Sequence, residues 1–87
     1  MLCLSSIFQD PTVVTINIGK NGIDEKIIKE VENVLRARGV VKIRLLKNFR
    51  EAYGYTREEV AIILSQRLNA EVVGIRGYVI ALKKRRG

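Results

Sequence analysis

The sequence predicts a small α/β fold of the α+β type, a two-layer sandwich in which two helices cover one face of a four-stranded mixed sheet. Four short runs with apolar residues at every second position indicate strands. Two longer runs, with apolar residues three and four positions apart, indicate helices that each link two strands. The expected order is therefore β-α-β-α-β-β, and 87 residues suffice for one compact domain over residues 1–87.

The first half of the chain predicts a strand, a helix and a second strand. Residues 13–18 alternate in hydrophobicity, as a half-buried strand does. A helix is expected over about 24–38, because Asp24 can cap its start and Gly39 is the residue type that ends helices in a left-handed conformation. Residues 40–46 alternate again and predict the second strand, with one cationic face.

The second half predicts a loop, a helix and a hairpin. Residues 47–55 read as a loop, and Thr56 with Glu59 forms a capping box that starts the second helix. This helix is expected to end near residue 69. Two β-rich runs follow, separated by Arg76 and Gly77, which is short enough for a two-residue hairpin turn between antiparallel strands.

Composition narrows the classes of function. Sixteen Lys and Arg against nine Asp and Glu give a net charge of +7, which suits a polyanionic partner. No apolar run approaches the roughly 18 residues of a membrane span, and the first residues lack the pattern of a secretory signal. We therefore expect a soluble, cytoplasmic protein that does not interact with membranes.

Histidine is absent, and Cys3 is the only cysteine. The chain therefore lacks the commonest general base, the usual zinc ligands and the means to form an internal disulfide. No pair of carboxylates stands out as catalytic, because most acidic residues alternate with Lys or Arg along the helices. We expect no catalytic residues, no metal, no cofactor and no small-molecule substrate, and hence no enzyme.

The segment "INIGKNGI" carries the main motif, a Gly-x-x-Gly loop formed by Gly19, Lys20, Asn21 and Gly22. A nucleotide-binding P-loop is excluded because the lysine stands between the glycines, and a Rossmann fingerprint is excluded because its third glycine is missing. A short loop of this kind before a helix can clamp an RNA backbone, as in KH-type domains. The alternative is that the glycines only permit a tight turn between strand and helix.

Together, "INIGKNGI", "GVVKIRLL" and the hairpin "AEVVGIRGYVIAL" resemble the CRM domain, the family of YhbY-like RNA-binding proteins, over roughly residues 13–83. The resemblance implies a fold similar to the C-terminal domain of bacterial translation initiation factor three. It implies RNA as the partner, through precursors of the large ribosomal subunit or through intron splicing in plant organelles. It also implies that the loop Gly19–Gly22 contacts RNA.

The N-terminal segment, residues 1–12, departs from the family pattern. Family members usually carry a full helix before the first strand, whereas Asp10 and Pro11 interrupt the short segment here. A monomer is the expected state, and a dimer is the alternative if the segment leaves part of the sheet uncovered. The apolar residues that would then cover the sheet or meet a partner are Leu2, Leu4, Ile7 and Phe8.

Other basic residues extend the predicted RNA-binding surface. One group lies along the strands and the loop after the second strand, and the other forms the predicted basic tail at 83–87. The alternative for both groups is that the charges only face solvent and bind nothing. The first group is Lys42, Arg44, Lys47, Arg50 and Arg76, and the second is Lys83, Lys84, Arg85 and Arg86.

Three aromatic residues, Phe49, Tyr53 and Tyr55, lie in the predicted loop before the second helix. Exposed rings there could stack on unpaired bases. The simpler interpretation is structural, because Tyr55 directly precedes the Thr56 cap and can pack against Val60 as a hydrophobic staple.

Two other classes of protein remain open at this stage. An Alba-like, dimeric nucleic-acid-coating protein has the same order of strands and helices and binds DNA or RNA with low specificity. The second of these classes is a protein-interaction module that docks through its apolar N-terminal residues.

If RNA is the partner, affinity should fall steeply with salt, because each neutralised phosphate releases about 0.7 to 0.9 counterion. Removing Lys83–Arg86 should then flatten the dependence of log Kd on log salt, measured by fluorescence anisotropy. An unchanged slope would show that these residues are merely solvated.

Overall fold

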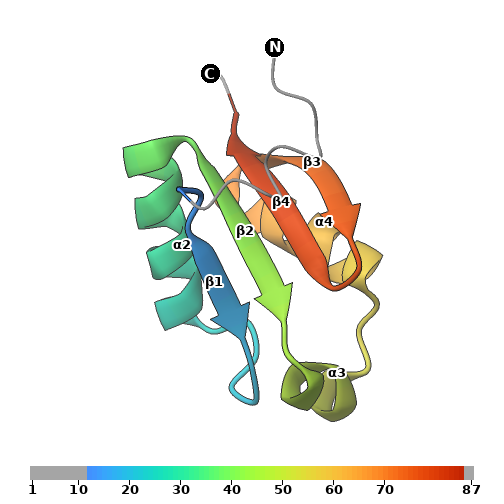
Figure 1. Cartoon of the computed structure of the whole chain (residues 1–87). Helices are drawn as coiled ribbons and strands as arrows, with labels where there is room; N and C mark the ends of the chain where they lie inside the picture. The colour runs from blue at the N-terminus through green and yellow to red at the C-terminus, as the bar shows by residue number, and fades with distance from the viewer. Residues whose placement is uncertain (1–11, 86–87) are drawn as a thin grey trace.

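The computed structural model describes residues 12–85, which form one four-stranded mixed sheet with three helices. The strands lie in the order β1-β2-β4-β3, as Figure 1 shows. Along the chain the elements are β1 (Thr15–Ile18), α2 (Glu25–Arg38), β2 (Val40–Leu45), α3 (Lys47–Tyr53), α4 (Arg57–Leu68), β3 (Ala70–Arg76) and β4 (Val79–Lys84).

The sheet combines one parallel and two antiparallel pairings. β1 and β2 run parallel, with Thr15 opposite Lys42 and Ile18 opposite Leu45, and α2 connects them. β4 lies between β2 and β3 and runs antiparallel to both. This confirms the predicted mixed sheet, because a parallel pair needs a crossover helix whereas the last two strands need only a tight turn.

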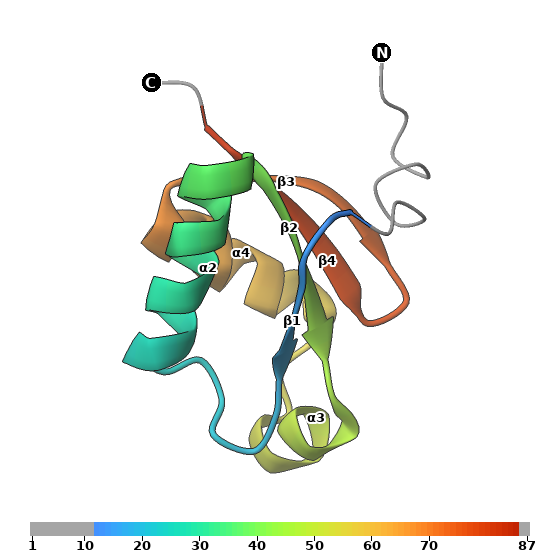
Figure 2. The same ribbon diagram turned by 60° about the vertical axis from the view of Figure 1, so that its left-hand side comes forward.

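Two layers are visible in Figure 2, where α2 and α4 lie together on one side of the sheet. The core lies between these layers. Its fully buried members come from every strand and from all three helices, and the larger ones are Ile18, Val31, Val41, Ile43, Phe49, Val60, Leu64, Ile80 and Leu82. No charged or polar side chain is buried in the described part of the chain, so apolar burial is the main stabilising term.

The helix ends follow the sequence prediction closely. Asp24 accepts a hydrogen bond from the Ile27 N–H at 2.8 Å, and Gly39 ends α2 with a φ of 81°. The capping box of Thr56 and Glu59 is complete, because each side chain accepts from the other residue's backbone N–H. These caps satisfy backbone groups that the helices would otherwise leave unpaired.

The predicted loop over residues 47–55 is wrong for residues 47–53, which form the short helix α3. Its start has no side-chain cap, so the local signal in the sequence is weak. Phe49 explains why it forms: this ring is completely buried in the core, and the following Gly54 takes a left-handed φ of 66° that ends the helix. Tertiary packing therefore determines α3.

Several boundaries differ from the prediction, and β2 ends at Leu45 rather than at residue 46. β1 begins at Thr15 rather than at residue 13. The hairpin turn is Gly77–Tyr78 rather than Arg76–Gly77, and the positive φ at Gly77 alone fits a type II′ turn. The predicted basic tail is partly strand, because Lys83 and Lys84 belong to β4.

The expectations for residues 1–11, including Cys3 and the apolar N-terminal residues, lie outside the described residues, as does Arg86. Among the described helices, none combines the length and apolar character needed to cross a membrane.

The assignment of α3 to the core gives a stability prediction. Phe49→Ala should lower the free energy of unfolding by about 3–5 kcal/mol, because it leaves a cavity under the sheet. Ile62→Ala on α4 is the matched control: Ile62 is 56% exposed, so the change should stay within about 0.5 kcal/mol. Urea denaturation followed by circular dichroism measures both, and equal effects would contradict a structural role for α3.

Candidate nucleic-acid interface

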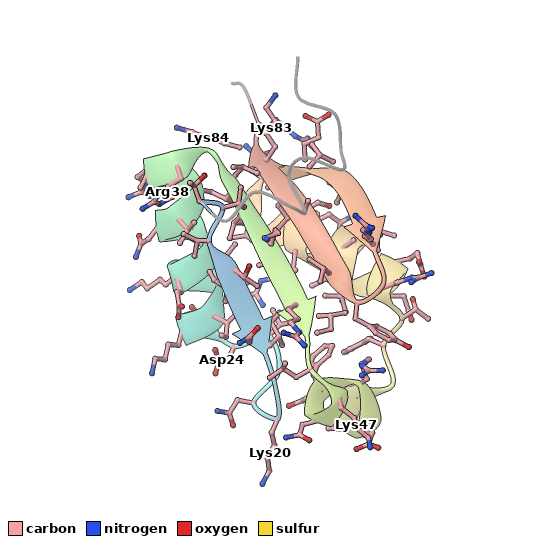
Figure 3. All side chains as sticks on the ribbon, in the orientation of Figure 1. Lys20, Asp24, Arg38, Lys47, Lys83 and Lys84 are labelled. Atoms are coloured by element: carbon pink, nitrogen blue, oxygen red, sulfur yellow. The ribbon has the colours of Figure 1, made fainter. Side chains whose placement is uncertain are left out.

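The loop Gly19–Gly22 is a tight turn between β1 and α2. The Gly22 N–H donates to the Gly19 carbonyl at 2.9 Å, and Gly22 has a φ of 72°, in the left-handed region that favours glycine. Lys20 and Asn21, the two central residues, are exposed. In Figure 3, Lys20 lies at the tip of the loop and points away from the sheet.

Tyr53, the last residue of α3, supports this loop. Its hydroxyl donates a hydrogen bond to the Lys20 carbonyl at 3.1 Å. A Cβ atom on Gly22 would lie 2.8 Å from the Tyr53 ring, closer than real Cβ contacts allow. Gly22 is therefore favoured both by its backbone conformation and by the approach of this ring, which supports the loop from below.

Three aromatic rings stack behind the loop. The ring centroids of Phe49 and Tyr53 are 5.2 Å apart, and Tyr55 lies nearly parallel to Tyr53 at 6.3 Å. Since Phe49 is buried, it anchors the two tyrosines to the core. Phe49 thus has a structural role, Tyr53 and Tyr55 stay exposed beside it, and the contact of Tyr55 with Val60 stays a prediction.

The start of α2 offers fewer donors to a phosphate than the sequence suggested. The Ile27 N–H donates to the Asp24 carboxylate, and the Ile28 N–H donates to the Asp24 carbonyl at 3.0 Å. The carboxylate also places a negative charge at the helix end. The groups at this edge that could meet an anion are therefore mainly Lys20, Asn21 and the loop backbone.

A second feature is a hollow of about 690 Å³, which we call the sheet hollow. It lies where α3 meets the sheet face turned away from α2 and α4. Its lining residues are Thr15, Lys42, Arg44, Leu45, Leu46, Lys47, Arg50, Arg76, Tyr78 and Val79, and none of them is acidic.

The sheet hollow unites cations that the sequence could only place on separate elements. Lys42 and Arg44 come from β2, Lys47 and Arg50 from α3, and Arg76 from β3. β2 contributes two because its even-numbered side chains alternate with the buried Val41, Ile43 and Leu45. The concentration of charge follows from this alternation and from the position of α3.

Leu46 connects the loop to the sheet hollow. Its N–H donates to the Ile18 carbonyl at 2.9 Å, and its side chain would be 3.4 Å from a Cβ atom on Gly19. The same residue lines the hollow. Loop and hollow are therefore adjacent, and Figure 3 shows Lys20 and Lys47 at the same end of the molecule.

The other predicted cations lie elsewhere. Figure 3 shows Lys83 and Lys84 at the opposite end of the sheet from Lys20. Arg85 follows them and donates to the Ala70 carbonyl at 3.4 Å. The structure thus separates these three residues from the loop, whereas the sequence analysis had placed them on the same RNA-binding surface as the loop.

The sequence analysis did not identify Tyr78 as part of the sheet hollow. The guanidinium carbon of Arg50 lies 3.7 Å from the centroid of the Tyr78 ring, a cation–π contact at the edge of the sheet hollow. The only signal in the sequence was an aromatic residue beside a turn glycine, which does not indicate a binding role.

The fold and this exposed turn define a small α/β domain with a cationic edge and no metal-binding cluster of His, Cys, Asp or Glu within residues 12–85. The chain belongs to the CRS1 / YhbY (CRM) domain family, whose model matches residues 9–84. This is a family of RNA-binding domains and not of enzymes.

Two individual proteins illustrate the relationship. The probable RNA-binding protein MJ0652 of Methanocaldococcus jannaschii is 38% identical over 68 residues, which cover 75% of this chain and 46% of that protein. The chain thus spans about half the length of this relative. The solution structure of the hypothetical protein SAV1595 of Staphylococcus aureus, described as a candidate RNA-binding protein, has a TM-score of 0.68 at 28% identity, covering 97% of this chain and 82% of that one.

Substitutions of Gly22 and Gly54 test whether Tyr53 supports the loop. Gly54 also has a positive φ but has open space around its Cβ position, so Gly54→Ala should cost only the left-handed strain of about 1–2 kcal/mol. Gly22→Ala should cost about 0.5–1.5 kcal/mol more, because the exposed end of the Tyr53 ring must move and lose its hydrogen bond.

Urea denaturation measures this difference. Adding Tyr53→Leu to both glycine variants should abolish it, since the obstructing ring is then gone. Equal costs for the two single glycine substitutions would show that Tyr53 does not hold the loop.

Proposed function

We propose that this protein binds RNA by clamping the sugar-phosphate backbone with the loop Gly19–Gly22. The observation that carries the proposal is the fixed, outward turn in which Lys20 and Asn21 are exposed while Tyr53 holds the backbone beneath them. A turn that served only to connect β1 with α2 would not need a dedicated buttress from another helix.

The chemistry of the loop suits a phosphate. A side chain on Gly19 or Gly22 would point toward Leu46 or Tyr53, so the two glycines let the turn lie close against the protein while Lys20 and Asn21 stay exposed. Lys20 supplies a positive charge, and Asn21 supplies amide donors beside it. This matches the use of short glycine loops as backbone clamps. Because the turn is already formed, the entropic cost of binding is lower.

The wider surface supports a long polyanion. The sheet hollow adds five cations on the same side as the loop, which favours a ligand that extends from one to the other. Membership of the CRM family and the RNA-binding names of both relatives favour RNA over the Alba-like alternative. We propose no chemical reaction, cofactor or small-molecule substrate.

We further propose that the natural ligand is a precursor of the large ribosomal subunit, in the cytoplasm, and that the protein acts as a monomer. Support for this comes from the family resemblance. Crosslinking the tagged protein in its own cells and sequencing the attached RNA tests it: enrichment of large-subunit rRNA precursors is expected, and genome-wide recovery of DNA would favour the Alba-like class.

A pair of matched substitutions tests the clamp. Lys20→Gln and Lys84→Gln each remove one positive charge, at opposite ends of the molecule in Figure 3. With a transcript of large-subunit rRNA as probe, Lys20→Gln should weaken binding and reduce the slope of log Kd against log salt by about 1, as the loss of one phosphate contact requires. Lys84→Gln should bind like the unaltered protein.

Substitution is preferable here to truncation, because residues 83 and 84 pair within β4 and their removal would damage the sheet. Equal weakening by both variants would mean that the loop acts only through the net charge of the chain. Wild-type binding by Lys20→Gln would mean that the glycines serve the turn alone.

A further inference from the structure

The rim of the sheet hollow carries an exposed aromatic ring. Tyr78 is the second residue of the hairpin turn and is 49% exposed, a large accessible fraction for a tyrosine. Its ring takes no part in the core or in the stack of Phe49, Tyr53 and Tyr55. Burial in the core therefore does not account for this side chain.

Arg50 holds the Tyr78 ring in place. The guanidinium lies 3.7 Å from the ring centroid, and the half-buried Arg50 side chain comes from α3. The buried Arg50 Nε has no hydrogen-bond partner in the described part of the chain, so stacking on Tyr78 is the contact that orients this guanidinium. Arginine and tyrosine arranged in this way present a flat, ordered platform.

Cations surround this platform without acidic partners. Arg44, Lys47 and Arg76 are exposed and line the same hollow. None of these three takes part in an ion pair with another described residue, in contrast to Arg36, Arg57 and Arg67 on the helices. Their positive charge is therefore available to a ligand in the hollow.

A platform next to phosphate-binding cations fits an unpaired nucleotide. Base stacking on aromatic side chains is the main device by which proteins hold single-stranded RNA, because a duplex hides the faces of its bases. The volume of about 690 Å³ also falls within the range of pockets that hold small organic molecules, of which a nucleotide is one. An acidic protein segment would have no need of the ring.

We infer that the sheet hollow binds an unpaired nucleotide next to the RNA segment that the loop Gly19–Gly22 clamps, with its base stacked on Tyr78 and its phosphates against Arg44, Lys47 and Arg76. This inference rests on the proposed RNA binding and specifies the kind of RNA: a helix or loop flanked by single-stranded residues. Leu46, which contacts the loop and lines the hollow, marks the path between the two sites.

Three RNA probes test the inference by fluorescence anisotropy: a blunt duplex, the same duplex with a short uridine extension, and the same duplex with an abasic extension of equal length. The two extended probes carry the same phosphates and differ only in their bases. The unaltered protein should bind the uridine probe about five- to tenfold more tightly than the abasic probe, the low end of what one stacked base supplies.

Two substitutions of Tyr78 identify the platform. Tyr78→Leu keeps an apolar side chain but removes the flat ring, so it should bind the uridine and abasic probes equally. Tyr78→Phe keeps the ring and should retain the full preference. Thermal unfolding by circular dichroism checks that both variants fold, and the blunt duplex checks that each retains the loop contact.

A direct contact can also be mapped. Ultraviolet crosslinking to the uridine probe followed by tryptic digestion should label the peptide of residues 77–83, which begins after Arg76 and ends at Lys83. The inference is overturned if the wild-type protein does not distinguish uridine from abasic extensions, or if Tyr78→Leu keeps the preference, as it would if the hollow served a protein partner.

The binding results distinguish a wrong nucleotide site from a wrong backbone clamp. If only the nucleotide site is wrong, the blunt duplex still binds, and Lys20→Gln still weakens that binding more than Lys84→Gln does. If the clamp is wrong, that contrast disappears for the blunt duplex. If none of the three probes binds, both proposals are overturned.

Discussion

The parallel pairing of β1 with β2 is the constraint on which the candidate interface depends. Neighbouring parallel strands end at the same edge of a sheet, so whatever follows each of them must lie side by side. Here the glycine loop follows β1 and α3 follows β2, and the register of Ile18 with Leu45 puts Gly19 next to Leu46. One pairing thus brings together two segments that are about 25 residues apart in the chain.

Helix α3 links the stability of the core to the shape of the binding loop. Phe49 on one side of this short helix is buried, and Tyr53 one turn later contacts Gly22 and the Lys20 carbonyl. The loop therefore does not need large internal contacts of its own to keep one conformation. A loop fixed in this way can bind a backbone without a large loss of conformational entropy.

The charge distribution differs between the sheet hollow and the helical layer. Arg44, Lys47 and Arg76 line the hollow and take part in no ion pair with another described residue, whereas the cations on the helices include the pairs Arg36–Glu32 and Arg67–Glu25. Exposed pairs of this kind add little to stability, but they reduce the positive potential of the helical layer. The cations of the sheet hollow lie beside the loop, which favours the approach of a polyanion from that side.

The sequence by itself determined the order of the strands and main helices and the caps at Asp24, Gly39 and Thr56, because each depends on residues close together in the chain. It also identified the family, because three motifs along the chain resemble it. Only the tertiary structure decided that 47–53 is a helix, since burial of Phe49 supplies what local propensity lacks. It also gathered the cations of β2, α3 and β3 into one hollow and set Lys83 and Lys84 apart. Tyr53 and Tyr78 gained their roles from partners more than 25 residues away, and no local pattern records such a contact.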